Sequence, residues 1–435
     1  MNLHAVFCQA NKITKNKHLT MLIVVNLLYC LFFVDNTNAS NDNNISFGSN
    51  LGIYKDIVSD ENADFFSQPK PVMHNRIIAE LDLDDYYRST NHNKEFKETA
   101  IKAKLFNNIH LNNKISLNSY LKLQDVKNLN RPWQTNNHNG RDRFLKDLGL
   151  FAEEINLRYL YENKLKKISN NLILGKFNLG FGTAWRWDRG ISIHSLAETY
   201  KQTEKIGIAN VLQLGNAKKT GQYNFGLSFF YNDQKILDNA LFANKHSDPK
   251  SSAIPGDSRA LKSYNFSTDI NFDFKKNEKL SYHFSYLNLD VNGRNSRVNP
   301  SKVADQKGIA YAINYQYPLS QRIILDGLIE YTKINNYLGN SDQLRSYLSS
   351  NLLIKIDQSW NLLLGNTRLK DRNYNDLGFN QNFSEISAGY QFKKNNFFDK
   401  LTLQIGYRYN RLSFLNQTTE TQSSYGLLLR YFKDF

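Results

Sequence analysis

Segments in which apolar and polar residues alternate recur along this chain from about residue 76 to its last residue. In the clearest of them, residues 400–411, the apolar positions are Leu401, Leu403, Ile405, Tyr407 and Tyr409. Alternation with a period of two residues predicts a β-strand with one apolar face, and helical periodicity is nearly absent from this part of the chain. The sequence therefore predicts an all-β fold.

The length and the chemistry of these segments favour a transmembrane antiparallel β-barrel over a soluble β-sandwich, whose strands also alternate. Many segments run for ten residues or more, whereas soluble strands usually have five or six. Their apolar faces begin or end in aromatic residues, as expected at the two lipid–water boundaries of a membrane. Their opposite faces carry charged and small residues. We expect the barrel to lie in a bacterial outer membrane, in contact with its lipid and lipopolysaccharide.

The last segment of the chain supports the same interpretation. It reads "SYGLLLRYFKDF" and places Tyr425, Leu427, Leu429, Tyr431 and Phe435 on one face. A terminal strand that closes on a C-terminal Phe resembles the signal by which bacterial outer-membrane barrels are recognised for insertion. The resemblance implies that the barrel-assembly machinery is a partner, through Phe435.

The pattern predicts about sixteen strands, an even number as in bacterial single-chain barrels. They are expected near residues 76–87, 97–109, 113–124, 149–162, 166–177, 203–215, 221–234, 260–274, 279–289, 306–318, 321–333, 343–356, 359–370, 383–394, 400–413 and 420–435. The connections after even-numbered strands are short, and those after odd-numbered strands are often long. This is the alternation of periplasmic turns and external loops that outer-membrane barrels show.

The N-terminal residues predict an exported protein. Lys12, Lys15 and Lys17 precede an apolar run from Met21 to Val34 and the residues "NTNAS". This is the pattern of a signal peptide, which we assign to residues 1–39. Residues 40–75 have no strand pattern for most of their length, and we expect a flexible periplasmic segment, with a small plug as the alternative. The barrel is assigned to residues 76–435.

Composition excludes several classes of site. Both cysteines, Cys8 and Cys30, lie in the predicted leader, so the mature chain has no thiolate for metal binding or catalysis. No P-loop, Gly-x-Ser-x-Gly or His-Glu-x-x-His motif occurs, and the histidines are scattered without ligand spacing. We expect no enzyme activity, metal, cofactor or nucleic-acid partner. An outer-membrane hydrolase using His283 and Ser285 is only a minor alternative, because both residues lie on the inward face, the wrong side for a phospholipase site that faces lipid.

The inward face of the predicted strands is charged. About sixteen strands enclose more space than side chains can fill, so an aqueous channel is the expected result. With the net charge of +15 for the whole chain, a basic surplus predicts a bias toward anions; the alternative is that these charges only solvate the wall. The residues expected to line the pore are Lys102, Lys104, Lys122, Arg158, Arg322, Arg345, Lys355, Arg408, Arg430, Asp269, Asp273, Asp326, Glu330 and Glu385.

Residues 177–190, "FNLGFGTAWRWDRG", open the long connection after the fifth predicted strand and show no clear period. A loop at this place folds inward and narrows the channel in sixteen-stranded porins, so we expect the 178–202 loop to form a constriction. Its tryptophans could offer flat faces to a solute or pack against the barrel wall, and both interpretations stay open. The residues expected at the constriction are Trp185, Arg186, Trp187, Asp188, Arg189, Glu198 and Lys201, with Glu204 as a weaker candidate.

Three stretches resemble a group of porin-like outer-membrane proteins of proteobacteria: "LILGKFNLGFGTAWRWDRGI", "AETYKQTEKIGI" and "FFYNDQKILDNALFANK". The resemblance is strong over about residues 170–245 and diffuse elsewhere. The chain departs from the group at Arg186 and Trp187, which make this stretch more basic. The resemblance implies a porin fold and no particular solute.

The sequence thus predicts a porin, a channel for passive diffusion of small hydrophilic solutes, and a homotrimer is an expectation from its size. The alternative is a surface or structural barrel with a closed lumen, such as an adhesin or an envelope anchor.

Overall fold

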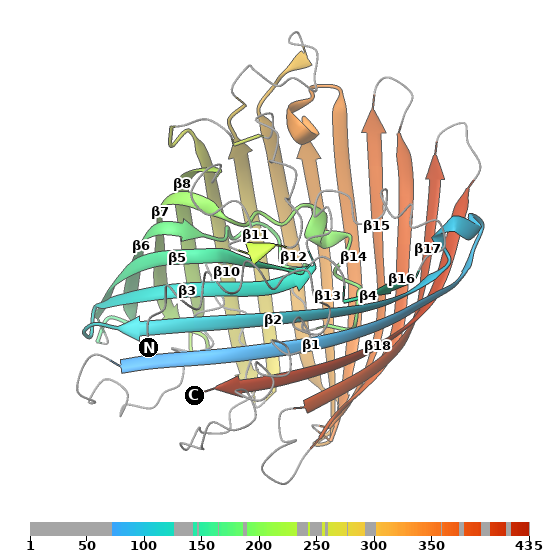
Figure 1. The fold of residues 1–435 in the computed structure, drawn as a ribbon. Coiled ribbons are helices and arrows are strands. Elements are labelled where there is room, and N and C mark those ends of the chain that lie inside the picture. Colours follow the sequence, from blue (N-terminus) through green and yellow to red (C-terminus); the bar gives the residue numbers. More distant parts are fainter. Residues whose placement is uncertain are drawn as a thin grey trace, which may run out of the picture.

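The computed structural model of the chain is a closed antiparallel barrel of sixteen long strands (Figure 1). It describes residues 72–125, 142–145, 148–163, 165–185, 189–232, 242–243, 255–256, 260–275, 277–291, 302–357, 359–373, 378–392, 401–414 and 419–434. The predicted leader, most of the predicted periplasmic segment and Phe435 lie outside these residues.

The long strands overlap the sixteen predicted segments one for one. They are β1 (Val72–Ser89), β2 (Phe96–His110), β3 (Ile115–Asp125), β5 (Leu148–Asn163), β6 (Ile168–Phe177), β7 (Lys205–Asn216), β8 (Gly221–Asn232), β10 (Ser263–Lys275), β11 (Glu278–Leu289), β12 (Gln306–Pro318), β13 (Ile323–Asn335), β14 (Gln343–Ile356), β15 (Trp360–Asn373), β16 (Phe379–Gln391), β17 (Leu401–Phe414) and β18 (Glu420–Asp434). The prediction of a porin-like all-β barrel is confirmed.

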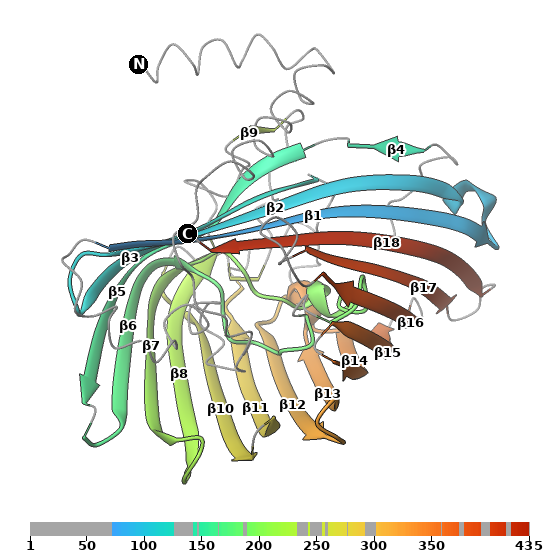
Figure 2. The same ribbon diagram turned by 90° about the horizontal axis from the view of Figure 1, so that it is seen from below.

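Each long strand pairs with its neighbours in the chain, and β1 closes the barrel against β18. In this closing pair, Arg76 lies opposite Asp434 and Leu81 opposite Leu429. The ring of strands is visible in Figure 2. The short turns lie at one end of the barrel and the longer connections at the other, because the strands are antiparallel and even in number. We call the second end external, following the arrangement of outer-membrane barrels.

The remaining elements are short. The strand β4 (Arg143–Phe144) extends the sheet beside β2, and β9 (Phe242–Ala243) pairs with β5. The 3-10 helices are η1 (His92–Lys94), η2 (Ala197–Thr199) and η4 (Tyr337–Gly339). No helix among the described residues is both long enough and apolar enough to cross a membrane. The first strand starts four residues before the boundary expected at residue 76.

Residues along each strand alternate between an apolar outer face and a polar inner face. On β13, for example, Ile329 is 60% exposed on the outside, whereas the neighbouring Glu330 is 1% exposed inside. The closed barrel pairs the strand backbones with one another, which a chain in hydrocarbon requires. An apolar exterior around a polar interior is the pattern of a transmembrane barrel.

One strand departs from regular alternation. Between β3 and β5, Tyr120 lies opposite Glu154 and Leu121 opposite Ala152, so Glu153 is an extra residue in the ladder. Such a bulge brings two successive side chains to the same face. Glu153 and Glu154 are consequently both buried on the inside of the barrel.

Candidate channel and its constriction

Residues 178–185 and 189–204, from the connection between β6 and β7, lie inside the barrel, as Figure 2 shows for the segment that carries η2. Its apolar residues pack against the inner wall: Phe181, Leu196 and Tyr200 are at most 1% exposed. Tyr200 meets Tyr347 of β14 with ring centroids 4.8 Å apart. Burying each of these large side chains contributes about 1.5–3 kcal/mol, so apolar packing alone favours the inward position.

A carboxylate of β13 fixes the beginning of this loop. The Oε2 atom of Glu330 accepts hydrogen bonds from the backbone N–H of Thr183 (2.5 Å), from its hydroxyl (2.7 Å) and from the N–H of Ala184 (3.1 Å). The Oε1 atom accepts a hydrogen bond from the Tyr200 hydroxyl. Hydrogen bonds to a charged group are the stronger kind, and here they satisfy a carboxylate that the loop covers.

A second carboxylate holds the middle of the loop. Glu385 of β16 accepts hydrogen bonds from the N–H groups of Ile191 (2.7 Å) and Ser192 (2.8 Å), one on each oxygen. The preceding Gly190 has a φ of +70°, and an added Cβ would lie 2.5 Å from the Glu385 carboxylate. Glycine is therefore required here both for the backbone conformation and for the close approach to β16.

Two arginines complete the attachment of the loop to the wall. Arg189 donates to Asp326 of β13 at 2.5 Å and is itself 4% exposed. Arg408 of β17 donates to the hydroxyl of Ser192 at 2.8 Å and pairs with Asp84 of β1 at 2.8 Å. The three carboxylates expected to line the pore on this side, Asp326, Glu330 and Glu385, thus attach the loop to the wall beneath it.

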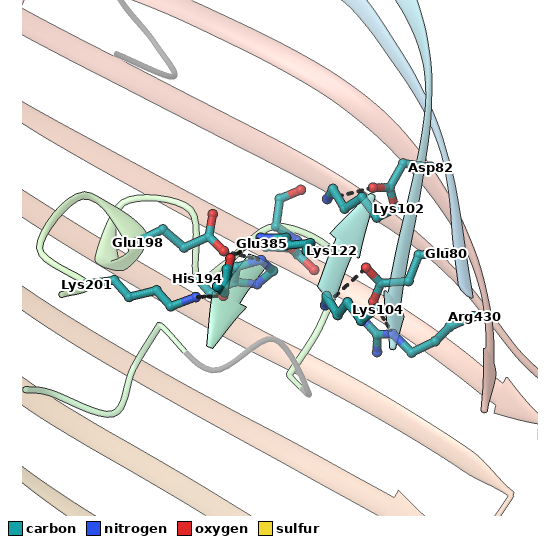
Figure 3. A network of polar contacts seen from close by, with 12 residues as sticks. Glu80, Asp82, Lys102, Lys104, Lys122, His194, Glu198, Lys201, Glu385 and Arg430 are labelled. Atoms are coloured by element: carbon teal, nitrogen blue, oxygen red, sulfur yellow. Dashed lines mark hydrogen bonds and ion pairs between the residues drawn. The ribbon is translucent and has the colours of Figure 1, made fainter. Parts of the chain in front are cut away.

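The wall facing the loop carries a group of lysines, shown in Figure 3. They come from adjacent inward positions of β2 and β3, and each is paired with a carboxylate. The pairs are Lys102 with Asp82 (2.9 Å), Lys104 with Glu80 (3.4 Å) and Lys122 with Glu153 (3.2 Å). Arg430 of β18 also donates to Glu80, at 2.7 Å.

The loop presents three ionisable side chains toward these lysines: His194, Glu198 and Lys201 (Figure 3). Burial lowers the pKa of His194 to about 4, against the attraction of Glu198, so His194 is neutral at pH 7. Burial disfavours the Glu198 carboxylate, but the nearby cationic groups, Lys122 and Lys201 among them, lower its pKa overall. Glu198 is 46% exposed and therefore puts a negative charge at the constriction, opposite the lysines of the wall.

The structure places the predicted constriction residues in different environments. Trp185 donates its indole N–H to the carbonyls of Phe181 and Gly182, both at 3.0 Å, and Lys201 lies 4.9 Å over its ring. These contacts favour packing within the loop over contact with a solute. Lys201 also lies 3.8 Å from Glu153. The predicted residues Arg186, Trp187 and Asp188 lie outside the described residues.

All nine basic residues expected to line the pore are found in ion pairs. In addition to those above, Arg158 pairs with Glu154 (3.7 Å), Arg345 with Asp371 (2.5 Å) and Lys355 with Asp326 (3.1 Å). Arg322 is not on the inner wall: it lies in the turn before β13, 80% exposed and 3.7 Å from Asp357. This placement corrects its expected position, because β13 begins two residues later than predicted.

Apart from Asp326, the carboxylates that balance these cations are absent from the expected lining residues, although the sequence pattern indicates some of them. Glu80, Asp82 and Asp84 alternate with Ala79, Leu81 and Leu83, so the pattern of the first strand already put them inside. Glu153 could not be found by alternation, because the bulge reverses its face. Together these partners balance the basic surplus that the expected lining residues alone suggested.

One cluster has the composition of a hydrolytic triad. His283 lies 2.8 Å from Asp269 and 3.1 Å from the hydroxyl of Ser285. The loop covers it, since Ser285 is 0% exposed and its oxygen accepts a hydrogen bond from the N–H of Gly182 at 3.3 Å. A substrate carbonyl cannot reach this hydroxyl, so the cluster supports the loop position.

Asp273, which was also expected in the lining, lies on the same inward face of β10 as Asp269 and is partly buried.

Within the described ranges, no three His, Cys, Asp or Glu side chains are grouped so that they could hold a metal ion.

Comparison with known proteins finds similarity in structure only. No protein-family model and no curated protein matches the sequence. Among solved structures, the outer-membrane channel DcaP of Acinetobacter baumannii is 10% identical with a TM-score of 0.46, covering 83% of this chain and 96% of DcaP. An anion-selective porin from Comamonas acidovorans is 9% identical (TM-score 0.43; 84% and 99% covered). OpdK of Pseudomonas aeruginosa, solved with vanillate, is 9% identical (TM-score 0.44; 83% and 99% covered).

Proposed function

We propose that this barrel is a channel for passive diffusion of small hydrophilic solutes through the outer membrane. The observation that carries the proposal is the loop of residues 178–204, which is attached to one side of the lumen and faces a charged wall on the other. The partly exposed charges of Glu198 on the loop and Lys102 on the facing wall suit water and dissolved solutes better than an apolar core does.

Bilayer recording of the purified protein tests this proposal. The channel predicts stepwise current increases as single barrels insert. No stepwise current from barrels shown to be folded would overturn it and favour the closed surface or structural barrel instead.

We further propose that any anion bias is weak. The net charge of the chain favours anions, but carboxylates pair with every basic residue expected in the lining, and the exposed Glu198 opposes the lysines of β2 and β3. Across the constriction, acid on the loop and base on the wall create a transverse field, which orients dipolar solutes more than it selects one sign of charge. The reversal potential in a KCl gradient measures this, and strong cation preference would contradict the proposal.

We also propose two kinds of partner: further copies of the chain in a homotrimer, and the barrel-assembly machinery. A homotrimer predicts that the unboiled protein runs at about three times its mass on a denaturing gel and at monomer mass after boiling. Recognition by the assembly machinery through Phe435 predicts that deleting this residue lowers the amount of folded protein in the outer membrane. Folded barrel at wild-type amounts after the deletion would contradict that role.

A further inference from the structure

The outer face of β13 to β17 carries a basic groove near the external end of the barrel. Strand register places its residues side by side: Tyr331 is opposite Leu348, Leu348 opposite Arg368, Arg368 opposite Asn382, and Asn382 opposite Arg411. The next row toward the external end holds Ser346, Lys370, Asn380 and Ser413. These residues line a concavity of about 490 Å³.

The cations of this groove differ from those of the lumen. Arg368, Lys370 and Arg411 are exposed on the outer face, and none of the ion pairs among the described residues includes them. Asp371, which follows Lys370 on β15, faces inward and pairs with Arg345. Inside the barrel, by contrast, the lining cations have carboxylate partners. What sets these three exposed cations apart is that they line one concavity of the outer face, where a single anionic group can contact all of them.

We propose that this groove binds the phosphorylated glycolipid of the outer leaflet, through its lipid A headgroup. Arginine and lysine suit phosphate groups. The side-chain amides of Asn380 and Asn382 suit the hydroxyl and amide groups of the sugar. Tyr331 and Leu348, on the apolar side of the groove, lie where an acyl chain would pass. The external position of the groove puts it in the leaflet that holds this lipid.

The test is binding of purified diphosphoryl lipid A to the detergent-solubilised, full-length mature barrel, followed by native mass spectrometry. Arg368→Gln combined with Arg411→Gln removes two groove cations. A matched control, Lys97→Gln with Lys307→Gln, removes two exposed outward cations at the external ends of β2 and β12, outside the groove. We expect the groove variant to bind about twenty-five-fold more weakly, since each of the two cations near an anionic lipid contributes roughly a factor of five. The control variant should bind as the wild type does.

Three results would overturn the proposal. The first is equal loss of lipid A binding in both double variants. The second is an equal loss of phosphatidylglycerol binding in the groove variant, which would indicate a general site for anionic lipid. The third is loss of an oligomer without loss of lipid A, which would indicate that a second copy of the chain occupies the groove. Channel conductance of the groove variant should stay at the wild-type value, so this test is independent of the channel function.

Discussion

Replacing Glu330 by alanine should release the beginning of the constriction loop from the barrel wall. The Glu330 carboxylate accepts two backbone N–H bonds and two hydroxyl bonds from loop residues while 1% exposed. Without it, the N–H groups of Thr183 and Ala184 stay buried without a partner, at about 1–3 kcal/mol each. Docking should therefore weaken by about 4 kcal/mol, which raises the undocked fraction roughly a thousandfold.

Glutamine at the same position provides a graded comparison. Its carbonyl oxygen can still accept from Thr183 and Ala184, so Glu330→Gln loses mainly the benefit of the charge, about 1 kcal/mol. Asn118→Ala serves as the matched control, because Asn118 is a buried inner-wall residue whose described hydrogen bond goes to Ser116 on its own strand.

Single-channel recording measures the effect. The wild type and the Asn118 variant should give steady current, and Glu330→Ala should fluctuate between the wild-type level and a larger one. Labelling supplies a second readout, since both cysteines of the sequence, Cys8 and Cys30, lie in the predicted leader: Ala184→Cys should react with a methanethiosulfonate reagent only when Glu330 is also replaced. Wild-type current and wild-type labelling in folded Glu330→Ala barrels would refute the anchoring role of this carboxylate.

The other predictions concern charge, pH and the covered triad. Glu198→Gln should shift the permeability ratio toward anions by up to about fivefold, and Lys122→Gln should shift it toward cations. Reversal potentials in a KCl gradient measure both shifts, and shifts of the same sign would contradict the transverse field. The pKa of His194 is lowered from 6.5 to about 4 in the docked loop. As pH falls, His194 of an undocked loop is therefore protonated before His194 of a docked loop, and this favours the undocked state. Docking should weaken as pH falls from about 6.5 to 4 and should be constant above pH 6.5. Current fluctuations recorded from pH 8 to 4 should follow this profile, and His194→Gln should remove the part due to this residue. Ser285→Ala should leave the hydrolysis of p-nitrophenyl esters unchanged from the wild-type background and cost about 1 kcal/mol of stability in thermal unfolding; esterase activity lost on this change would contradict the covered triad.

The strands could be predicted because a membrane barrel imposes one rule on every strand. Because one face of a strand meets lipid and the other meets water, successive residues along the strand differ in polarity. The inward position of Glu330 could therefore be predicted from the sequence. Its burial could not, because the loop that covers it comes from about 150 residues earlier in the chain. No local sequence pattern distinguishes inward carboxylates that contact water from those that accept a hydrogen bond from a backbone N–H.

Local irregularities of the strands are the second limit on what the sequence predicts. The extra residue at Glu153 shifts the alternation within β5, and nothing in the letters "AEEIN" marks where the ladder is interrupted. The position of Arg322 was wrong for a related reason, since the boundary of β13 decides whether its side chain lies on the wall or in a turn. Alternation determines the face of a residue only where the strand boundaries are known.

The attachment of the loop has a consequence for how such a protein can change over generations. Glu330 and Glu385 bind mainly main-chain N–H groups, which almost every amino acid provides. Glu198, which is 46% exposed, takes no part in those bonds. In the proposed channel, substitutions of Glu198 should therefore alter which solutes are admitted while assembly proceeds as before. Selectivity and folding are separable traits in this barrel, and an engineer could vary the first without repairing the second.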